Sequence, residues 1–152
     1  MLKLRKNKKG FTLVELIVVI AIMAVLAGVV AGVTVSQLNK QTNKTGSTQA
    51  RTIADYISTV TLTGENEEGE LKLLTEAGAF DADKVKKLIE DQYSASSIPV
   101  KYATAAGTAN GEITVFIADG KVNVSYKPKG SGANTVYIVG TDGVVSVPSS
   151  NG

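Results

Sequence analysis

A run of twenty uncharged and mostly apolar residues, 16–35, constrains this chain more than any other feature of its sequence. At a rise of about 1.5 Å per residue, such a run makes a helix of roughly 30 Å, which matches the hydrocarbon core of a bilayer. The run has no polar face, so it is not a helix that lies along a membrane surface. The sequence therefore predicts one helix able to cross a membrane.

Basic residues are concentrated before this run. Five of the sixteen Lys and Arg residues fall within the first ten positions, and the next basic residue is Lys40. A basic start predicts that the N-terminus stays in the cytoplasm and that the rest of the chain is exported. A plain transmembrane anchor and a secretory signal peptide both fit this layout, although a signal peptide has a shorter apolar core, about 7–15 residues.

Neither alternative explains Glu15, whose carboxylate lies at the start of the apolar run. A carboxylate in a membrane helix costs on the order of 2.5–3.5 kcal/mol at the bilayer centre and less near its edge, so such a residue usually has a partner. The residues alone leave two roles open for this side chain. It either snorkels to the lipid headgroups or pairs with a cation.

The segment Lys8-Lys9-Gly10-Phe11-Thr12-Leu13-Val14-Glu15, followed by the long apolar run, resembles the leader and the start of a type IV prepilin. The resemblance implies that a membrane prepilin peptidase cuts after Gly10 and methylates the new amine of Phe11. It also implies that the subunit waits in the membrane by its helix. An ATP-driven assembly machinery then extracts the subunit into a helical filament.

Assembly roles are expected for four residues: the resemblance implies those of Phe11 and Glu15, and the spacing of two glycines suggests the others. Glu15 is expected to pair with the amine of Phe11, of its own chain or of a neighbouring subunit, because an unpaired charge is costly among packed apolar helices. Gly28 and Gly32 form a GxxxG pair, a spacing that lets helices approach closely in membranes. Many family members carry proline at the position of Gly32, where the helix can melt during assembly. Glycine permits such melting here without forcing it.

Residues 36–63 contain no proline, and their apolar side chains fall roughly on one helical face. They are predicted to continue the helix as an amphipathic half that ends at Gly64. A flexible linker is the alternative, because residues 37–49 are polar and include Gly46.

Two short helices are expected in the region that follows. One covers residues 71–77 and is stopped by Gly78, and the other begins after Asp81 as its N-cap. The acidic residues between 65 and 70 are interpreted as a solvated loop, with a calcium site as the less favoured alternative.

Alternating sequences in the last third of the chain predict strands. Asp119-Gly120 and Asp142-Gly143 each lie between two such runs, a pattern typical of two-residue hairpin turns. For the first hairpin this turn predicts three facing pairs on one face of the sheet, the face that covers the long helix: Ile117 with Val122, Val115 with Val124, and Ile113 with Tyr126. Residues 98–102 are expected to form an edge strand, because Pro99 is tolerated there.

The predicted fold class is α+β. A long N-terminal helix, with its apolar half protruding, packs against a small antiparallel sheet, and short helices lie in the connecting loop. Four segments are expected along the chain. These are a cleaved basic leader at 1–10, a transmembrane or filament-core helix half at 11–35, an amphipathic helix half at 36–63, and a globular head with two hairpins at 64–152.

The composition excludes several kinds of chemistry. The chain has no Cys and no His, so thiolate nucleophiles, disulfides, Cys or His metal sites and His-dependent triads are impossible. We expect no catalytic residues, no metal and no cofactor. Cleavage after Gly10 leaves eleven basic against fourteen acidic residues, so the formal net charge changes from +2 to −3. A nucleic-acid partner is not expected from this charge or from the few aromatic residues.

The predicted function is that of a structural subunit, the major pilin of a type IV pilus (fimbrium) that serves adhesion, twitching motility or DNA uptake. The lack of Cys favours a Gram-positive, type IVa-like pilin. Expected partners are copies of itself, the prepilin peptidase, the assembly machinery and, before assembly, the lipid bilayer. The chain is thus expected in the cell membrane first and in the extracellular filament later. The alternatives are a minor pilin, a pseudopilin of a type II secretion or competence apparatus, and a membrane-anchored binding domain that does not polymerise.

Overall fold

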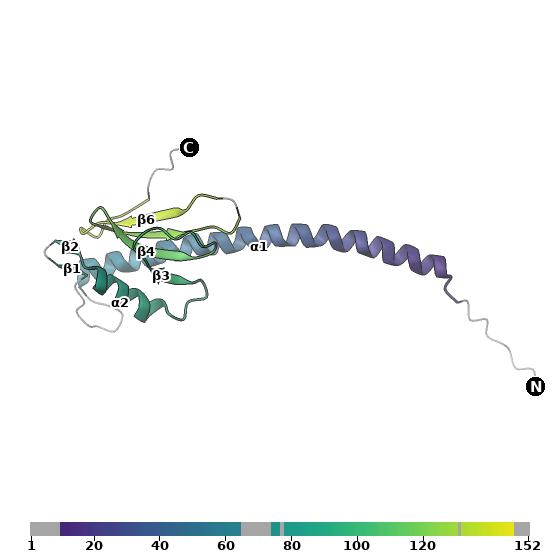
Figure 1. Ribbon diagram of the computed structural model, residues 1–152, viewed down its shortest axis with the longest axis horizontal. Coiled ribbons are helices and arrows are strands. Elements are labelled where there is room, and N and C mark those ends of the chain that lie inside the picture. The colour runs from purple at the N-terminus through teal and green to yellow at the C-terminus, as the bar shows by residue number, and fades with distance from the viewer. Residues whose placement is uncertain (1–9, 65–73, 77, 131, 148–152) are drawn as a thin grey trace, which may run out of the picture. The chain divides into compact units, whose positions relative to one another are not determined.

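The computed structural model describes residues 10–64, 74–76, 78–130 and 132–147 (Figure 1). Most of the basic leader, the acidic stretch with its calcium alternative, and the last five residues lie outside these ranges. The chain divides into two compact units, Met1–Leu38 and Asn39–Gly152.

The first element is helix α1, Leu13–Thr63, which is helical over all of its 51 residues. A helix rather than a flexible linker is therefore found at residues 36–63. The helix ends as predicted at Gly64, which takes a left-handed conformation with φ of 69° and donates its N–H to the Val60 carbonyl at 2.8 Å. A glycine in this conformation is the common way for a helix to stop.

Seven threonines along α1 make the same kind of hydrogen bond. Each donates its hydroxyl to the backbone carbonyl four residues earlier, at distances of 2.7 to 3.1 Å. This arrangement satisfies the side-chain donor inside the helix itself. The threonines concerned are Thr34, Thr45, Thr48, Thr52, Thr59, Thr61 and Thr63.

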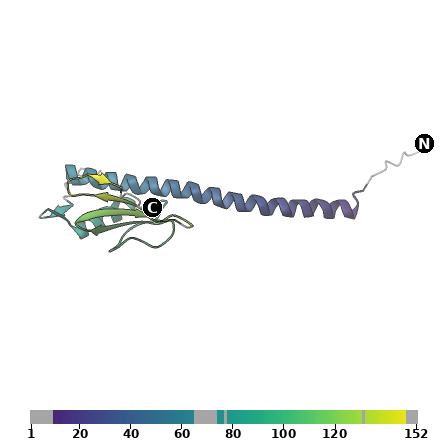
Figure 2. The same ribbon diagram turned by 90° about the horizontal axis from the view of Figure 1, so that it is seen from above.

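The second unit contains a five-stranded sheet that lies along the part of α1 from residue 39 onward (Figures 1 and 2). The strand order is β3-β4-β5-β6-β7. The strands are β3 (Val100–Tyr102), β4 (Ile113–Ala118), β5 (Lys121–Tyr126), β6 (Thr135–Val139) and β7 (Val145–Ser146).

The first hairpin has the predicted register. The pairs Ile113 with Tyr126, Val115 with Val124 and Ile117 with Val122 all occur between β4 and β5. The turn has positive φ at both central residues, 52° at Asp119 and 69° at Gly120, as a type I′ turn requires. Five of these six side chains are fully buried and Ile117 is partly buried, so the predicted core face is confirmed.

The second hairpin, β6 with β7, forms around a longer connection than predicted. Gly140 donates its N–H to the Val144 carbonyl at 3.0 Å, which leaves Thr141, Asp142 and Gly143 as a three-residue loop. Gly143 has φ of 73°. A three-residue loop that ends in a left-handed glycine is the next most common hairpin connection after the two-residue turns.

The sheet is mixed, so the prediction of a purely antiparallel sheet is wrong at one edge. The edge strand β3 runs parallel to β4, with Val100 opposite Ile113. Parallel pairing requires the chain to cross back before β4 begins, and residues 103–112 supply this connection. The position of β3 at the edge of the sheet is as predicted.

The predicted helix at 71–77 is also wrong where the structure describes it. Thr75–Glu76 is a strand, β1, and it pairs antiparallel with β2, Ala79–Phe80. Gly78 has φ of 82° in the connection between these strands. A helical segment of only two turns is marginal by itself, so this tight turn and the strand pairing prevail.

Helix α2, Ala82–Tyr93, begins as predicted with Asp81 as its N-cap. The Asp81 carboxylate accepts a hydrogen bond from the Lys84 N–H at 2.9 Å. The helix buries Val85, Leu88 and Ile89. These residues join the core formed by α1 and the sheet.

One glycine of α1 is required by packing. A Cβ atom on Gly46 would lie 2.2 Å from the ring of Tyr126, which is fully buried. Next to this contact, the Asn43 side chain holds the backbone of Lys129 at both its N–H, 2.8 Å, and its carbonyl, 3.0 Å. The Oδ1 atom of Asn43 also accepts a hydrogen bond from the Tyr126 hydroxyl at 3.1 Å. The glycine that weakens the helical pattern is therefore a position where a side chain of the sheet packs directly against the helix backbone.

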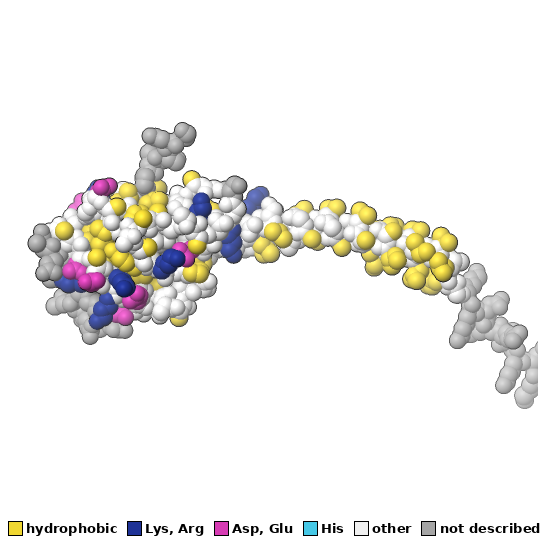
Figure 3. Space-filling view, in the orientation of Figure 1, with side chains coloured by type: hydrophobic (Ala, Val, Ile, Leu, Met, Phe, Trp, Pro, Cys, Tyr) yellow, Lys and Arg dark blue, Asp and Glu magenta, His cyan; other side chains and the backbone are white. Residues whose placement is uncertain are grey.

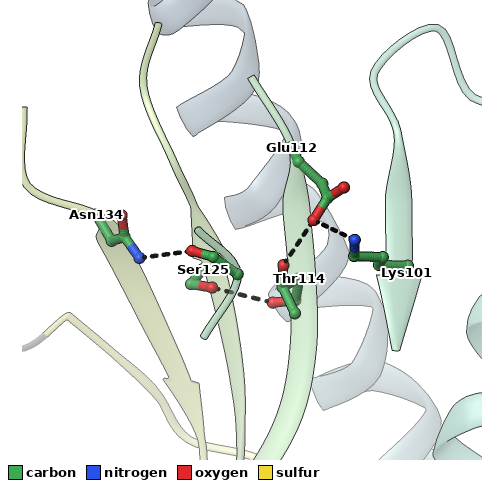
Figure 4. Close-up of polar contacts among 6 residues, drawn as sticks. Lys101, Glu112, Thr114, Ser125 and Asn134 are labelled. Carbon is green, nitrogen blue, oxygen red and sulfur yellow. Dashed lines mark hydrogen bonds and ion pairs between the residues drawn. The ribbon is translucent and has the colours of Figure 1, made fainter. Parts of the chain in front are cut away.

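A polar cluster occupies the other face of the sheet (Figure 4). Lys101 forms an ion pair with Glu112 at 2.8 Å, and the Thr114 hydroxyl donates to the same carboxylate at 3.4 Å. Ser125 donates to the Thr114 carbonyl at 3.3 Å. The side chains of Thr114 and Ser125 are buried although polar, and these bonds pair them.

Candidate processing and assembly site

The predicted cleavage position lies just before α1. Gly10 and Phe11 are both non-helical and exposed, and Phe11 is 88% exposed. The peptide bond between them is therefore outside the helical ladder of hydrogen bonds. Exposed segments without such bonds are where proteases act most readily.

The side chains of Thr12 and Glu15 together cap the N-terminus of the helix. The Thr12 N–H and hydroxyl both donate to Oε2 of Glu15 at 2.9 Å, and the Glu15 N–H donates to the Thr12 hydroxyl oxygen at 3.3 Å. This reciprocal arrangement is a capping box, in which two backbone donors at a helix start are satisfied by side chains. The roles considered from the sequence did not include it, although the spacing Thr-x-x-Glu was the signal for it.

The capping box sets where the Glu15 carboxylate points. It lies back over the N-terminal end of the helix, one residue from the nitrogen of Phe11. In the described parts of the chain this carboxylate makes no ion pair. A cation at a helix N-terminus is disfavoured by the helix dipole, and a carboxylate in the first turn offsets this. The arrangement therefore provides an acceptor next to the position where cleavage would create an amine.

The apolar part of α1 has no partner within its own unit. Its large hydrophobic side chains, from Leu13 to Val35, are each between 48% and 74% exposed. Figure 3 shows hydrophobic side chains all along this part of the helix. In the described residues, α1 is the one helix long and apolar enough to cross a membrane. Water-soluble monomers rarely expose a continuous apolar surface of this extent, so lipid or other helices must cover it.

Gly28 and Gly32 lie within this exposed segment. A Cβ atom on either would meet nothing within 4 Å. The helix is unbroken through both positions in the single chain. Packing within the chain therefore does not require these glycines. Melting near them concerns the assembled state and stays a prediction.

Within the residues that the structure describes, no three carboxylates come together in a way that would hold a metal ion. The hollow between the two hairpin turns contains the carboxylates of Asp119 and Asp142 beside Lys121. It is an open surface depression, and its lining residues give no nucleophile with a partnering base.

Comparison with known proteins identifies the N-terminal segment. Residues 5–31 match a family model described as the prokaryotic N-terminal methylation motif. The searches of curated proteins and of solved structures find no match for the chain. The match covers the predicted cleavage position, the capping box and most of the apolar run. The chain thus begins with the type IV prepilin leader signature, the N-terminal segment that pilins and pseudopilins share.

Proposed function

We propose that this chain is a prepilin whose mature form is the major structural subunit of a type IV pilus. The observation that carries the proposal is a methylation motif that leads directly into an apolar helical segment with exposed side chains. The lipid bilayer covers this segment before assembly, and the same segments of other subunits cover it in the filament. The chain is then a building block rather than an enzyme.

Processing follows from the start of the chain. The prepilin peptidase cuts the exposed bond after Gly10 and methylates the amine of Phe11. Cleavage removes the residues that hold the N-terminus in the cytoplasm. The mature N-terminus then lies next to the capping box of Thr12 and Glu15.

Glu15 sets the register of the assembled helices. Inside a bundle of apolar helices the dielectric is low, so the amine of Phe11 and the carboxylate of Glu15 are each costly unless paired. The capping box supports this role because it already directs the carboxylate toward the N-terminal end of α1. The pair forms with a neighbouring subunit in the filament or within the chain before assembly.

Gly28 and Gly32 contribute a surface for close helix contact. Small residues four apart let two helix backbones approach, and neither glycine has a role inside the single chain. The head, residues 64–152, then forms the outer wall of the filament and carries its adhesive or motility function. A Gram-positive, type IVa-like origin stays a prediction.

Two measurements test the proposal. Mass spectrometry of the surface protein should find an N-terminus at Phe11 with one added methyl group. Electron microscopy of material sheared from cells should find thin filaments built mainly of this chain. An intact leader would contradict the processing. Filaments dominated by another subunit would identify the chain as a minor pilin or as a pseudopilin of a secretion or competence apparatus.

A further inference from the structure

Four lysines gather at the end of the second unit where α1 enters it. Lys40 and Lys44 are one turn apart on α1, and Lys127 and Lys129 lie in the loop after β5. We call these four residues the basic collar. Figure 3 shows basic side chains at this end of the unit.

The hydrogen bonds around Asn43 hold the two halves of the collar together. The Asn43 side chain binds the backbone of Lys129 at both its N–H and its carbonyl, and Asn43 precedes Lys44 on the helix. The Tyr126 hydroxyl, next to Lys127, also donates to Asn43. The backbone of the loop that carries Lys127 and Lys129 is thus held by hydrogen bonds to the helix turn that carries Lys44.

The charge of the collar is not neutralised within the described parts of the chain. None of the four lysines forms an ion pair there, and Lys127 donates only to the neutral carbonyl of Gly132 at 3.1 Å. The Lys129 side chain packs over Gly111, and the next residue, Glu112, carries a carboxylate. That carboxylate, however, forms its ion pair with Lys101, at 2.8 Å. Helix α1 has no acidic residue between Glu15 and Asp55.

The collar follows directly on the apolar run. Lys40 comes five residues after Val35 and Lys44 nine, which along a helix is about 8 Å and about 14 Å. The polar headgroup layer on each side of a bilayer is several ångströms thick, roughly 5–8 Å. Flexible lysine side chains reach a further few ångströms toward that layer. Lys40 and Lys44 are therefore within reach of the headgroups whenever the apolar run spans the membrane.

We propose that the basic collar binds the phosphate groups of anionic lipids while the subunit is anchored in the membrane. Ammonium groups donate charge-assisted hydrogen bonds to phosphate oxygens, and lysines near an anionic surface add to its attraction. The proposal rests on the membrane-anchored stage of the proposed function. Once the leader is removed, Lys40 and Lys44 are the basic residues nearest to the apolar run in the sequence, so the collar holds the head at the membrane surface before assembly.

The absence of cysteine from the chain allows a direct test by fluorescence energy transfer. A single Ala109→Cys variant of the full chain, in the exposed loop before Gly111, is labelled with a donor dye. It is inserted into lipid nanodiscs whose headgroups carry an acceptor. Transfer should be higher in discs that contain phosphatidylglycerol than in discs of phosphatidylcholine alone. The difference should vanish at about 1 M salt, where the Debye length is about 3 Å.

Two matched pairs of substitutions locate the effect. Lys127→Gln with Lys129→Gln should lower the ratio of docked to undocked heads on the order of fivefold for each lysine. Lys86→Gln with Lys87→Gln, on α2, removes the same charge elsewhere on the head and should leave the ratio unchanged. Circular dichroism verifies that both variants are folded.

Three outcomes would overturn the proposal. Equal transfer in both lipids, with the chain inserted in the discs, would remove the lipid role and leave the proposed membrane stage intact. Failure of the chain to enter the discs would remove both. Collar variants that dock normally but no longer bind added duplex DNA would assign these lysines to a nucleic acid instead.

Discussion

Thr12 and Glu15 form reciprocal hydrogen bonds at the start of α1. The Thr12 N–H donates to Glu15 Oε2 at 2.9 Å, and the Glu15 N–H donates to the Thr12 hydroxyl at 3.3 Å. Glu15 therefore caps its own helix, in addition to the pairing between subunits proposed above. The two differ in whether they need a negative charge, because glutamine also serves in a capping box.

Glu15→Gln should separate these functions. We expect the helix start and membrane insertion to be kept, because glutamine accepts the Thr12 N–H. Filament yield should fall tenfold or more, since an amine left unpaired in a packed interior costs about 3–5 kcal/mol. Amide exchange at residues 13–16 measures the helix start, and the yield of sheared filaments measures assembly. Glu15→Ala, which removes both functions, is the comparison. Normal filaments from Glu15→Gln would limit Glu15 to capping.

Gly46→Ala should destabilise the head, although alanine is the better helix former. The added Cβ would lie 2.2 Å from the Tyr126 ring. Overpacking of this kind typically costs about 1–3 kcal/mol, more than the gain of about 1 kcal/mol in helix propensity. Urea unfolding followed by circular dichroism measures the change. Gly32→Ala is the matched control and should not lower stability, because its Cβ meets nothing within 4 Å.

Alkaline pH should weaken the fold through Tyr126. Burial raises the pKa of Tyr126 above its usual value, so the folded state favours the neutral phenol. This contribution is fully present below the unfolded pKa of about 10 and is lost as the pH rises through the folded pKa. The unfolding free energy should therefore fall above about pH 10. The pKa of Tyr102 is also raised, mainly by burial and to a smaller extent by the negative charge of Asp83. Tyr102 therefore adds to the loss of stability at alkaline pH.

The measurement is urea unfolding at several pH values from neutral to alkaline. Tyr126→Phe should flatten the alkaline slope, and Tyr102→Phe should remove only its own part. An unchanged slope in both variants would show that other groups cause the alkaline loss.

Gly28→Leu should leave the single chain unchanged and impair the filament. The position is open within the chain, so a leucine meets no neighbour and the helix gains propensity. In a close helix contact the same side chain would push the backbones apart. Thermal unfolding should be unaltered while the yield of sheared filaments drops several-fold. Val29→Leu, off the face shared by Gly28 and Gly32, is the control and should assemble normally.

Features that depend on local sequence were predicted well. The Asp119-Gly120 turn determines the register of β4 with β5, and Asp81 is the N-cap of α2. The leader motif is contained in one short segment, and the family match over residues 5–31 confirms it. In each case the decisive residues are neighbours in the chain, so their pattern can be read without knowing the fold.

Features that depend on distant partners were not predicted. The direction of β3 is determined by how residues 103–112 cross back to β4, which no local pattern records. Gly46 looked like a weak point of the helix because its partner, Tyr126, is eighty positions away in the chain. The capping box differs from both, because it depends on the local Thr-x-x-Glu spacing and is thus readable from the sequence, like the turns.

The hydrogen bonds that several α1 threonines make to their own helix affect how this helix responds to a change of surroundings. A side chain that already bonds its own helix, as Thr34 does with the Val30 carbonyl at 2.8 Å, leaves no donor unsatisfied when water is withdrawn. The same holds for Thr48 and Thr52 farther along the helix. When the surroundings change from water to lipid, or from lipid to a protein surface, these hydroxyl groups therefore keep their hydrogen-bond acceptor. Transfer of the helix between different surroundings therefore costs no hydrogen bond at these threonine hydroxyls.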